Sequence, residues 1–267
     1  MAYAFRTAAI LALLAMPVWA EGIQNPLTDS PTWNDLRFDL VGETVPIDGG
    51  PLLVEAPYRA HDAATVPVIL RQTDPTAVIT HATVVIDENP APVAAELSFG
   101  PAMSPIDFEL RVRVNQYSNV RVLTQTPEAT YMTGRFVKAS GGCSAPASRD
   151  PDQALAGLGQ MKLRMFGDAT QQSTARREAQ IMLRHPNYSG LQRNQITQLF
   201  IPAHFIDHLE VWQGDDLLFT MDGGISISEN PVFRFSYMDN GVPALTVKAT
   251  DTEGNAFEQV LAKTAEG

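Results

Sequence analysis

The sequence predicts an all-β protein of two antiparallel β-sandwich domains, and three observations support this fold class. Short segments of alternating apolar and polar residues follow one another along most of the chain, as in half-buried strands. Pro, Gly, Asn and Asp residues, which favour turns, separate these segments. A stretch rich in Gly, Ser, Ala and Pro divides them into two groups of about seven strands, a spacing typical of immunoglobulin-like sandwiches of about 100 residues each.

The first twenty residues have the composition of a secretory signal peptide. Arg6 is the one charged residue of this segment, and an apolar run at residues 7–16 follows it. About ten apolar residues are too few to cross a hydrocarbon layer of roughly 30 Å. We therefore expect residues 1–20 to be removed after Ala20. The mature chain is expected to be periplasmic, without insertion into a membrane.

The first sandwich is expected between residues 30 and 140. Its strands are predicted at residues 44–47, 66–70, 79–86, 94–99, 108–114, 120–123 and 131–138. In residues 108–114 every second side chain is apolar, so that face of the strand is expected to be buried. The charged residues between them, Glu109, Arg111 and Arg113, are expected to face water.

The second sandwich is expected between residues 159 and 267. Its strands are predicted at residues 161–166, 179–184, 205–213, 216–221, 231–237, 244–250 and 257–261. Short helical segments are predicted at residues 25–36 and 153–158. Residues 141–158 are predicted to form a linker, because they contain no apolar periodicity that would hold them against a core.

Charge and composition exclude several classes of function. The 267 residues include 30 Asp and Glu against 19 Lys and Arg, a net charge of −11. An acidic surface repels phosphates, so nucleic acid and anionic lipid are not expected as partners. The single Cys excludes an internal disulfide framework and any multi-cysteine metal site. The sequence contains no phosphate loop, dinucleotide fingerprint or nucleophile elbow, so no cofactor and no catalytic residue are predicted.

Cys143 is the candidate for chemistry, because an unpaired thiol is unusual in an exported protein. Gly141 and Gly142 precede it and Ser144 follows it, and none of these residues adds an apolar face. Glycine widens the freedom of the backbone, so these three residues are expected to form a flexible, exposed arm for the thiol. The ordinary alternative is a buried core cysteine, since free Cys is usually buried. An intermolecular disulfide is a further alternative.

With these residues in place, the two halves of the chain resemble two known families. The first half resembles SoxY, the sulfur-carrier subunit of thiosulfate-oxidising systems, at residues 108–123 and in the strand at 133–138 that leads into Gly141, Gly142 and Cys143. The second half resembles SoxZ, the partner of SoxY, at residues 185–190 (HPNYSG), 201–206 (IPAHFI) and 224–231 (GISISENP). The resemblance implies that Cys143 carries sulfur intermediates covalently while partner enzymes act on them, and that the protein itself is no enzyme.

The sequence departs from the SoxY pattern around the thiol. In that family the cysteine lies in Gly-Gly-Cys-Gly-Gly at a free end, whereas Ser144-Ala145-Pro146 follows it here and the chain continues. Fused chains of this layout are similar to a SoxYZ-like group associated with quinoprotein dehydrogenases. The implied partners are sulfur-oxidising enzymes, c-type cytochromes or a quinoprotein dehydrogenase. The alternative function is a non-catalytic docking module for that dehydrogenase or its cytochrome.

The remaining charged and histidine residues predict no metal site. His204 and His208 have a zinc-ligand spacing on a helix, but the residues around them alternate as in a strand. Both are therefore expected to be structural or interfacial, and His185, which precedes Pro186, is expected in a turn. Lys138 and Arg149 are the cations close to Cys143 in sequence, and they are candidates for favouring its thiolate.

Overall fold

A computed structural model describes residues 25–146, 155–167 and 175–263. Almost all regular structure in this part of the chain is β, with the helix α1 (Pro31–Val41) and the short 3-10 helices η1 (Pro101–Met103) and η2 (Gly142–Ser144). The predicted all-β fold class is confirmed. The predicted signal peptide, Arg149 and part of the predicted helical segment 153–158 lie outside the described residues.

The strands follow the predicted pattern closely. The first half contains β1 (Ile47–Asp48), β2 (Leu52–Glu55), β3 (Val66–Gln72), β4 (His81–Ile86), β5 (Val93–Phe99), β6 (Asp107–Val112), β7 (Ser118–Gln125) and β8 (Thr130–Val137). The second half contains β9 (Met161–Phe166), β10 (Arg176–Leu183), β11 (Ile206–Gln213), β12 (Asp216–Gly223), β13 (Val232–Met238), β14 (Ala244–Asp251) and β15 (Ala256–Ala262). β9 has the predicted bounds, whereas β2 was not predicted because it is short and directly follows glycines and a proline.

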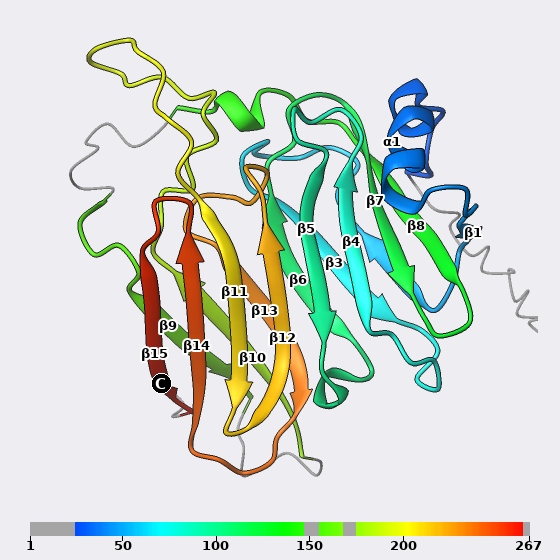
Figure 1. The fold of residues 1–267 in the computed structure, drawn as a ribbon, viewed down its shortest axis with the longest axis vertical. Helices are drawn as coiled ribbons and strands as arrows, with labels where there is room; N and C mark the ends of the chain where they lie inside the picture. The colour runs from blue at the N-terminus through cyan, green and yellow to red at the C-terminus, as the bar shows by residue number, and fades with distance from the viewer. Residues whose placement is uncertain (1–24, 147–154, 168–174, 264–267) are drawn as a thin grey trace, which may run out of the picture.

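The two predicted sandwiches lie side by side, and their sheets continue from one into the other (Figure 1). One sheet has the order β1-β8-β7-β4-β5-β12-β11-β14-β15, and the facing sheet has the order β2-β3-β6-β13-β10-β9. The halves meet edge to edge through two antiparallel pairs, β5 with β12 and β6 with β13. Each half therefore protects a sheet edge that would otherwise be open to solvent.

The hydrophobic core lies between the sheets and is shared by both halves. The apolar face predicted in residues 108–114 is confirmed: all four of its side chains are fully buried. The ring of Phe108 lies 5.7 Å from that of Phe99, and 4.9 Å and 6.2 Å from those of Phe219 and Phe233 in the second half. The two halves are therefore expected to fold as one cooperative unit.

Helix α1 covers the outer part of the nine-stranded sheet, and it begins later than the predicted segment 25–36. Ser30 caps it by accepting a hydrogen bond from the Trp33 N–H. The Arg121 guanidinium lies over the Trp33 ring and forms a 2.9 Å ion pair with the buried Asp87.

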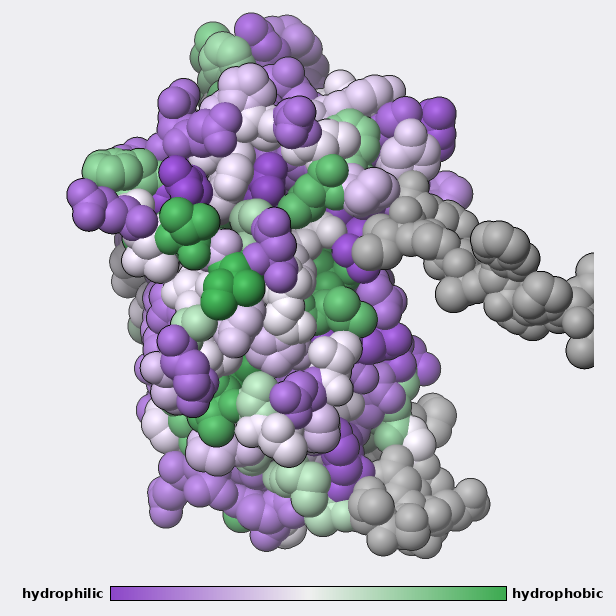
Figure 2. All heavy atoms as spheres, turned by 90° about the vertical axis from the view of Figure 1, so that its right-hand side faces the viewer, coloured by the Kyte–Doolittle hydropathy of each residue, from purple (hydrophilic) through white to green (hydrophobic). Residues whose placement is uncertain are grey.

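Figure 2 shows the side of the molecule that carries α1, where small hydrophobic patches alternate with hydrophilic ones. Among the described residues, no helix has the length and apolar character needed to cross a membrane.

Candidate functional site

Cys143 lies in a buried turn where the two halves of the chain meet. The turn is η2, and it docks on the residues that follow β6: the Gly141 N–H donates to the Asn115 carbonyl (2.8 Å) and the Gly142 N–H to that of Val114 (3.1 Å). Gly142 and Cys143 are buried, and Ser144 is exposed. The predicted exposure is therefore wrong for Gly142 and for the thiol of Cys143, and it is correct for Ser144. The alternative of a buried cysteine describes the thiol correctly.

The two glycines before the thiol have separate structural roles. Gly141 has φ +78°, a left-handed conformation that side chains disfavour. Gly142 needs no such conformation, but a Cβ atom there would overlap the carbonyl oxygen of Ala63 and lie 2.7 Å from the backbone N and O of Val114. One glycine therefore permits the turn, and the other lets the turn pack directly against backbone.

A loop from the second half covers the cysteine turn. We call residues 186–203 the cover loop; it connects β10 to β11 and extends beyond the ends of the sheets (Figure 1). Its Ser189 hydroxyl donates to the Cys143 carbonyl, and its Gln192 Nε2 donates to the Ala145 carbonyl over 3.0 Å. At its base, the backbones of Tyr188 and His204 exchange two hydrogen bonds. These contacts hold the buried cysteine turn in place from the second half of the chain.

Arg113 is the cation that faces the thiol, and the prediction that it faces water is wrong. Arg113 is only 1% exposed. Its backbone N–H donates to the Ser226 carbonyl of the second half, so at this point the chain is covered on both faces. Its guanidinium donates to the carbonyls of Gly142 (3.3 Å) and Asn187 (3.1 Å). Its Nε–H has no acceptor among the described residues.

Of the two cations expected near the thiol from sequence proximity, Lys138 does not fill this position. The Lys138 ammonium lies 4.6 Å from the centre of the Tyr58 ring, and Arg149 is outside the described residues. Sequence reasoning missed Arg113 because alternation assigned it to the solvent face of a strand. No signal within this strand would have identified it, because the carbonyls of Ser226 and Asn187 that accept its hydrogen bonds come from the second half of the chain.

Burial controls the protonation of the docked cysteine. It raises the pKa of the Cys143 thiol to about 11, and the charge of Arg113 offsets this effect only in part. Burial also lowers the pKa of Arg113, an effect that the charge of Cys143 opposes. The thiolate is the reactive form of cysteine, so the docked turn keeps the sulfur in its unreactive thiol form at neutral pH.

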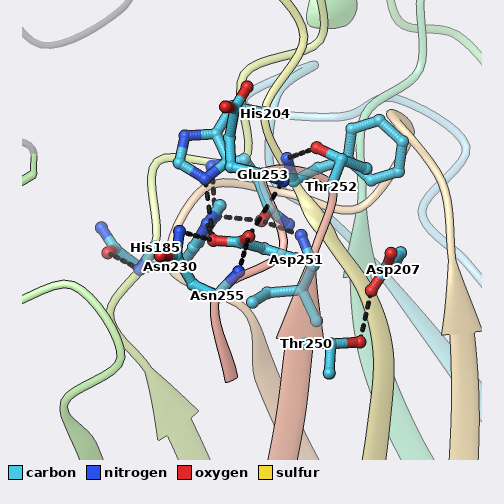
Figure 3. Close-up of polar contacts among 12 residues, drawn as sticks. His185, His204, Asp207, Asn230, Thr250, Asp251, Thr252, Glu253 and Asn255 are labelled. Carbon is cyan, nitrogen blue, oxygen red and sulfur yellow. Dashed lines mark hydrogen bonds and ion pairs between the residues drawn. The ribbon is translucent and has the colours of Figure 1, made fainter. Parts of the chain in front are cut away.

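Two histidines and a carboxylate meet beside the base of the cover loop (Figure 3). The Nε2 atoms of His204 and His185 lie 2.8 Å and 3.3 Å from the same Oδ2 atom of Asp251. His208, on β11, does not join them, because its side chain forms a hydrogen bond with Asp222 on β12. The sequence did not predict this cluster, since Asp251 is far from both histidines along the chain.

Comparison with known families identifies both halves. Residues 37–143 match the family model of the sulfur oxidation protein SoxY, and residues 165–262 match that of the sulphur oxidation protein SoxZ. The chain belongs to both families, as a SoxY–SoxZ fusion. The SoxY match ends at Cys143 itself, so the thiol of the fusion lies at the end of its SoxY domain and against its SoxZ domain.

The solved structures that match the chain include one that corresponds to the SoxY part of the fusion. It is the sulfur carrier protein SoxY from Chlorobium limicola f thiosulfatophilum, which is 24% identical, with a TM-score of 0.35. The match covers 40% of this chain and 91% of that chain. No curated protein matches the fusion.

Proposed function

We propose that this SoxY–SoxZ fusion is a non-catalytic carrier that holds a sulfur intermediate covalently on Cys143. The observation that carries the proposal is the position of its single thiol, at the end of a SoxY domain and under a loop of a SoxZ domain. We also propose that residues 1–20 direct the chain to the periplasm. There it would present its cargo to sulfur-oxidising enzymes.

The chemistry of the thiol suits such cargo. Joining the Cys143 thiolate to the outer sulfur of thiosulfate forms one S–S bond and removes two electrons. A c-type cytochrome is the class of partner that would accept these electrons. Attack of a partner's thiolate on the outer sulfur breaks this S–S bond, transfers the thiosulfonate to the partner and releases the Cys143 thiolate, so the carrier is regenerated.

The docked turn is then the resting state of the carrier. A buried thiol with a raised pKa neither attacks nor is attacked, so loading requires the turn to leave its site. Three side-chain donors hold the turn by its backbone carbonyls: Arg113, Ser189 and Gln192. None of them binds the sulfur itself in these contacts, so the turn can leave without breaking a bond to the thiol.

Intact-mass measurement tests the carrier proposal. The mature protein is incubated with thiosulfate and an oxidised c-type cytochrome, then analysed without reductant. We expect an adduct that disappears on reduction and is absent from Cys143→Ser. An unmodified thiol, or an equal adduct on Cys143→Ser, contradicts carriage. Capture of a quinoprotein dehydrogenase by both variants without any adduct would instead favour a docking module.

Gln192→Ala is expected to increase the rate of Cys143 modification by the thiol reagent DTNB about 5-fold. The variant loses the hydrogen bond to the Ala145 carbonyl, and a typical bond of this kind contributes about 1 kcal/mol to the docked state. Thr197→Ala, an exposed position of the same loop whose side chain does not contact the turn, is the matched control. Equal rates for Gln192→Ala and wild type would show that the loop does not hold the turn.

A further inference from the structure

The cluster at the base of the cover loop has the dimensions of a metal site. Ligand atoms of His185, His204 and Asp251 all lie within 4.8 Å of one another. In a tetrahedral site with metal–ligand bonds of about 2.0–2.1 Å, ligand atoms lie about 3.3 Å apart. The distance from His185 Nε2 to Asp251 Oδ2 is 3.3 Å. The distance from His204 Nε2 to the same oxygen is 2.8 Å and would have to widen by about half an ångström.

Asn187 makes two contacts with Nδ1 of His185, and they suit different tautomers of the ring. The amide orientation of Asn187 is set by two bonds: its Nδ2 donates to the Ser228 carbonyl, and its Oδ1 accepts from the Ile206 N–H. This Oδ1 lies 2.7 Å from His185 Nδ1, a contact that is attractive only when Nδ1 carries a proton. The Asn187 backbone N–H donates to the same Nδ1 over 3.0 Å, which suits a ring protonated on Nε2. A metal ion on Nε2 would select the tautomer with the proton on Nδ1.

A neutral His185 protonated on Nδ1 directs the lone pair of Nε2 at a carboxylate oxygen. Two acceptors that face each other need a cation between them. Without an ion, the carboxylate oxygen can accept a hydrogen bond from each Nε2–H, because it has more than one lone pair. A metal ion would replace both Nε2 protons and accept a lone pair from all three atoms. A histidine that binds a metal through one ring nitrogen usually donates a hydrogen bond from the other to an oxygen acceptor, and the Asn187 Oδ1 is placed to accept it from His185.

The carboxylate is held in position before any ion binds. Asp251 is buried; its Oδ1 accepts from the backbone N–H groups of Glu253 and Asn255, and its Oδ2 from the Asn255 side chain. His204 is the ligand nearest to solvent, with 13% of its side chain exposed, which leaves a route for an ion and a position for water. Two imidazoles with one carboxylate suit Zn²⁺ and similar ions.

We propose that His185, His204 and Asp251 bind one divalent transition-metal ion of the Zn²⁺ type. The two histidines flank the cover loop, and Asp251 ends β14, so the ion would fasten both ends of the loop to the SoxZ sheet. The same loop supplies the Ser189 and Gln192 contacts to the cysteine turn. The bound ion would therefore strengthen the cover over Cys143.

Zinc titration of the full mature chain tests the site. The protein is stripped with a chelator and titrated with ZnCl₂ alone, by calorimetry and by equilibrium dialysis with elemental analysis. All variants carry Cys143→Ser, so that the thiol cannot act as the ligand. We expect one equivalent to bind. His204→Gln should weaken binding at least 100-fold while circular dichroism shows an unchanged fold, and His208→Gln, a surface histidine paired with a carboxylate, should bind as the parent does.

Three outcomes would overturn the proposal. If the Cys143→Ser parent binds zinc no more tightly than the His204→Gln variant does, the site is excluded. If only His208→Gln loses zinc binding, the ion binds at the surface. Equal binding by all three proteins shows that the ion lies elsewhere. In the chain that retains Cys143, zinc should also slow DTNB modification at least 3-fold, and should not do so in His204→Gln. An unchanged rate would refute the link between the ion and the cover.

Discussion

Gly142→Ala is expected to expel the cysteine turn and to raise the rate of thiol modification about 100-fold at pH 8. The added Cβ would overlap the Ala63 carbonyl and crowd the backbone of Val114, and backbone atoms cannot rotate away as a side chain does. An undocked thiol returns from a pKa of about 11 to its ordinary value of 9.0. At pH 8 that change increases the thiolate fraction about 100-fold.

The measurement is the rate of DTNB reaction with the folded protein, and Gly141→Asn is the matched control. Gly141 has a positive φ, which Asn tolerates, and a Cβ there would meet no atom closer than 3.8 Å. The control should therefore react nearly as slowly as wild type. A slow reaction in Gly142→Ala would show that the turn docks without close backbone packing, and would remove the structural reason for this glycine.

Phe108→Ala is expected to reduce the free energy of unfolding by about 3–5 kcal/mol and to destabilise both halves together. The Phe108 side chain is fully buried, and its ring packs against Phe99 of the first half and Phe219 and Phe233 of the second. Removing it leaves a cavity between sheets that both halves share. Neither half can then retain its full core independently.

Urea unfolding measures this effect separately in each half. Trp33 reports on the first half and Trp212 on the second, in variants of the mature chain that retain one of the two. We expect both reporters to give one midpoint in wild type and to shift together in Phe108→Ala. Phe38→Ala, at a side chain that is 61% exposed, should change stability by less than about 0.5 kcal/mol. A shift of the Trp33 signal alone would show that the halves unfold independently.

Much of the fold was predictable because strand formation depends on local alternation. β9 was predicted with its observed bounds, and the apolar face of β6 was predicted residue by residue. Alternation failed at Arg113, because a strand that enters a junction is covered on both faces. The same junction reversed the expectation for Cys143, whose glycine-rich neighbours indicate mobility when considered alone.

The sequence alone determined where most strands lie along the chain. It also determined the family relationship and the choice of Cys143 as the candidate thiol. Tertiary structure decided the state of that thiol, since Ala63, Arg113 and Ser189 contact the backbone of its turn from distant parts of the chain. It also decided the pairing of His185 and His204 with Asp251. Local patterns record which side of a strand faces inward. Burial at a junction instead depends on which distant segments pack there, and no local pattern contains that information.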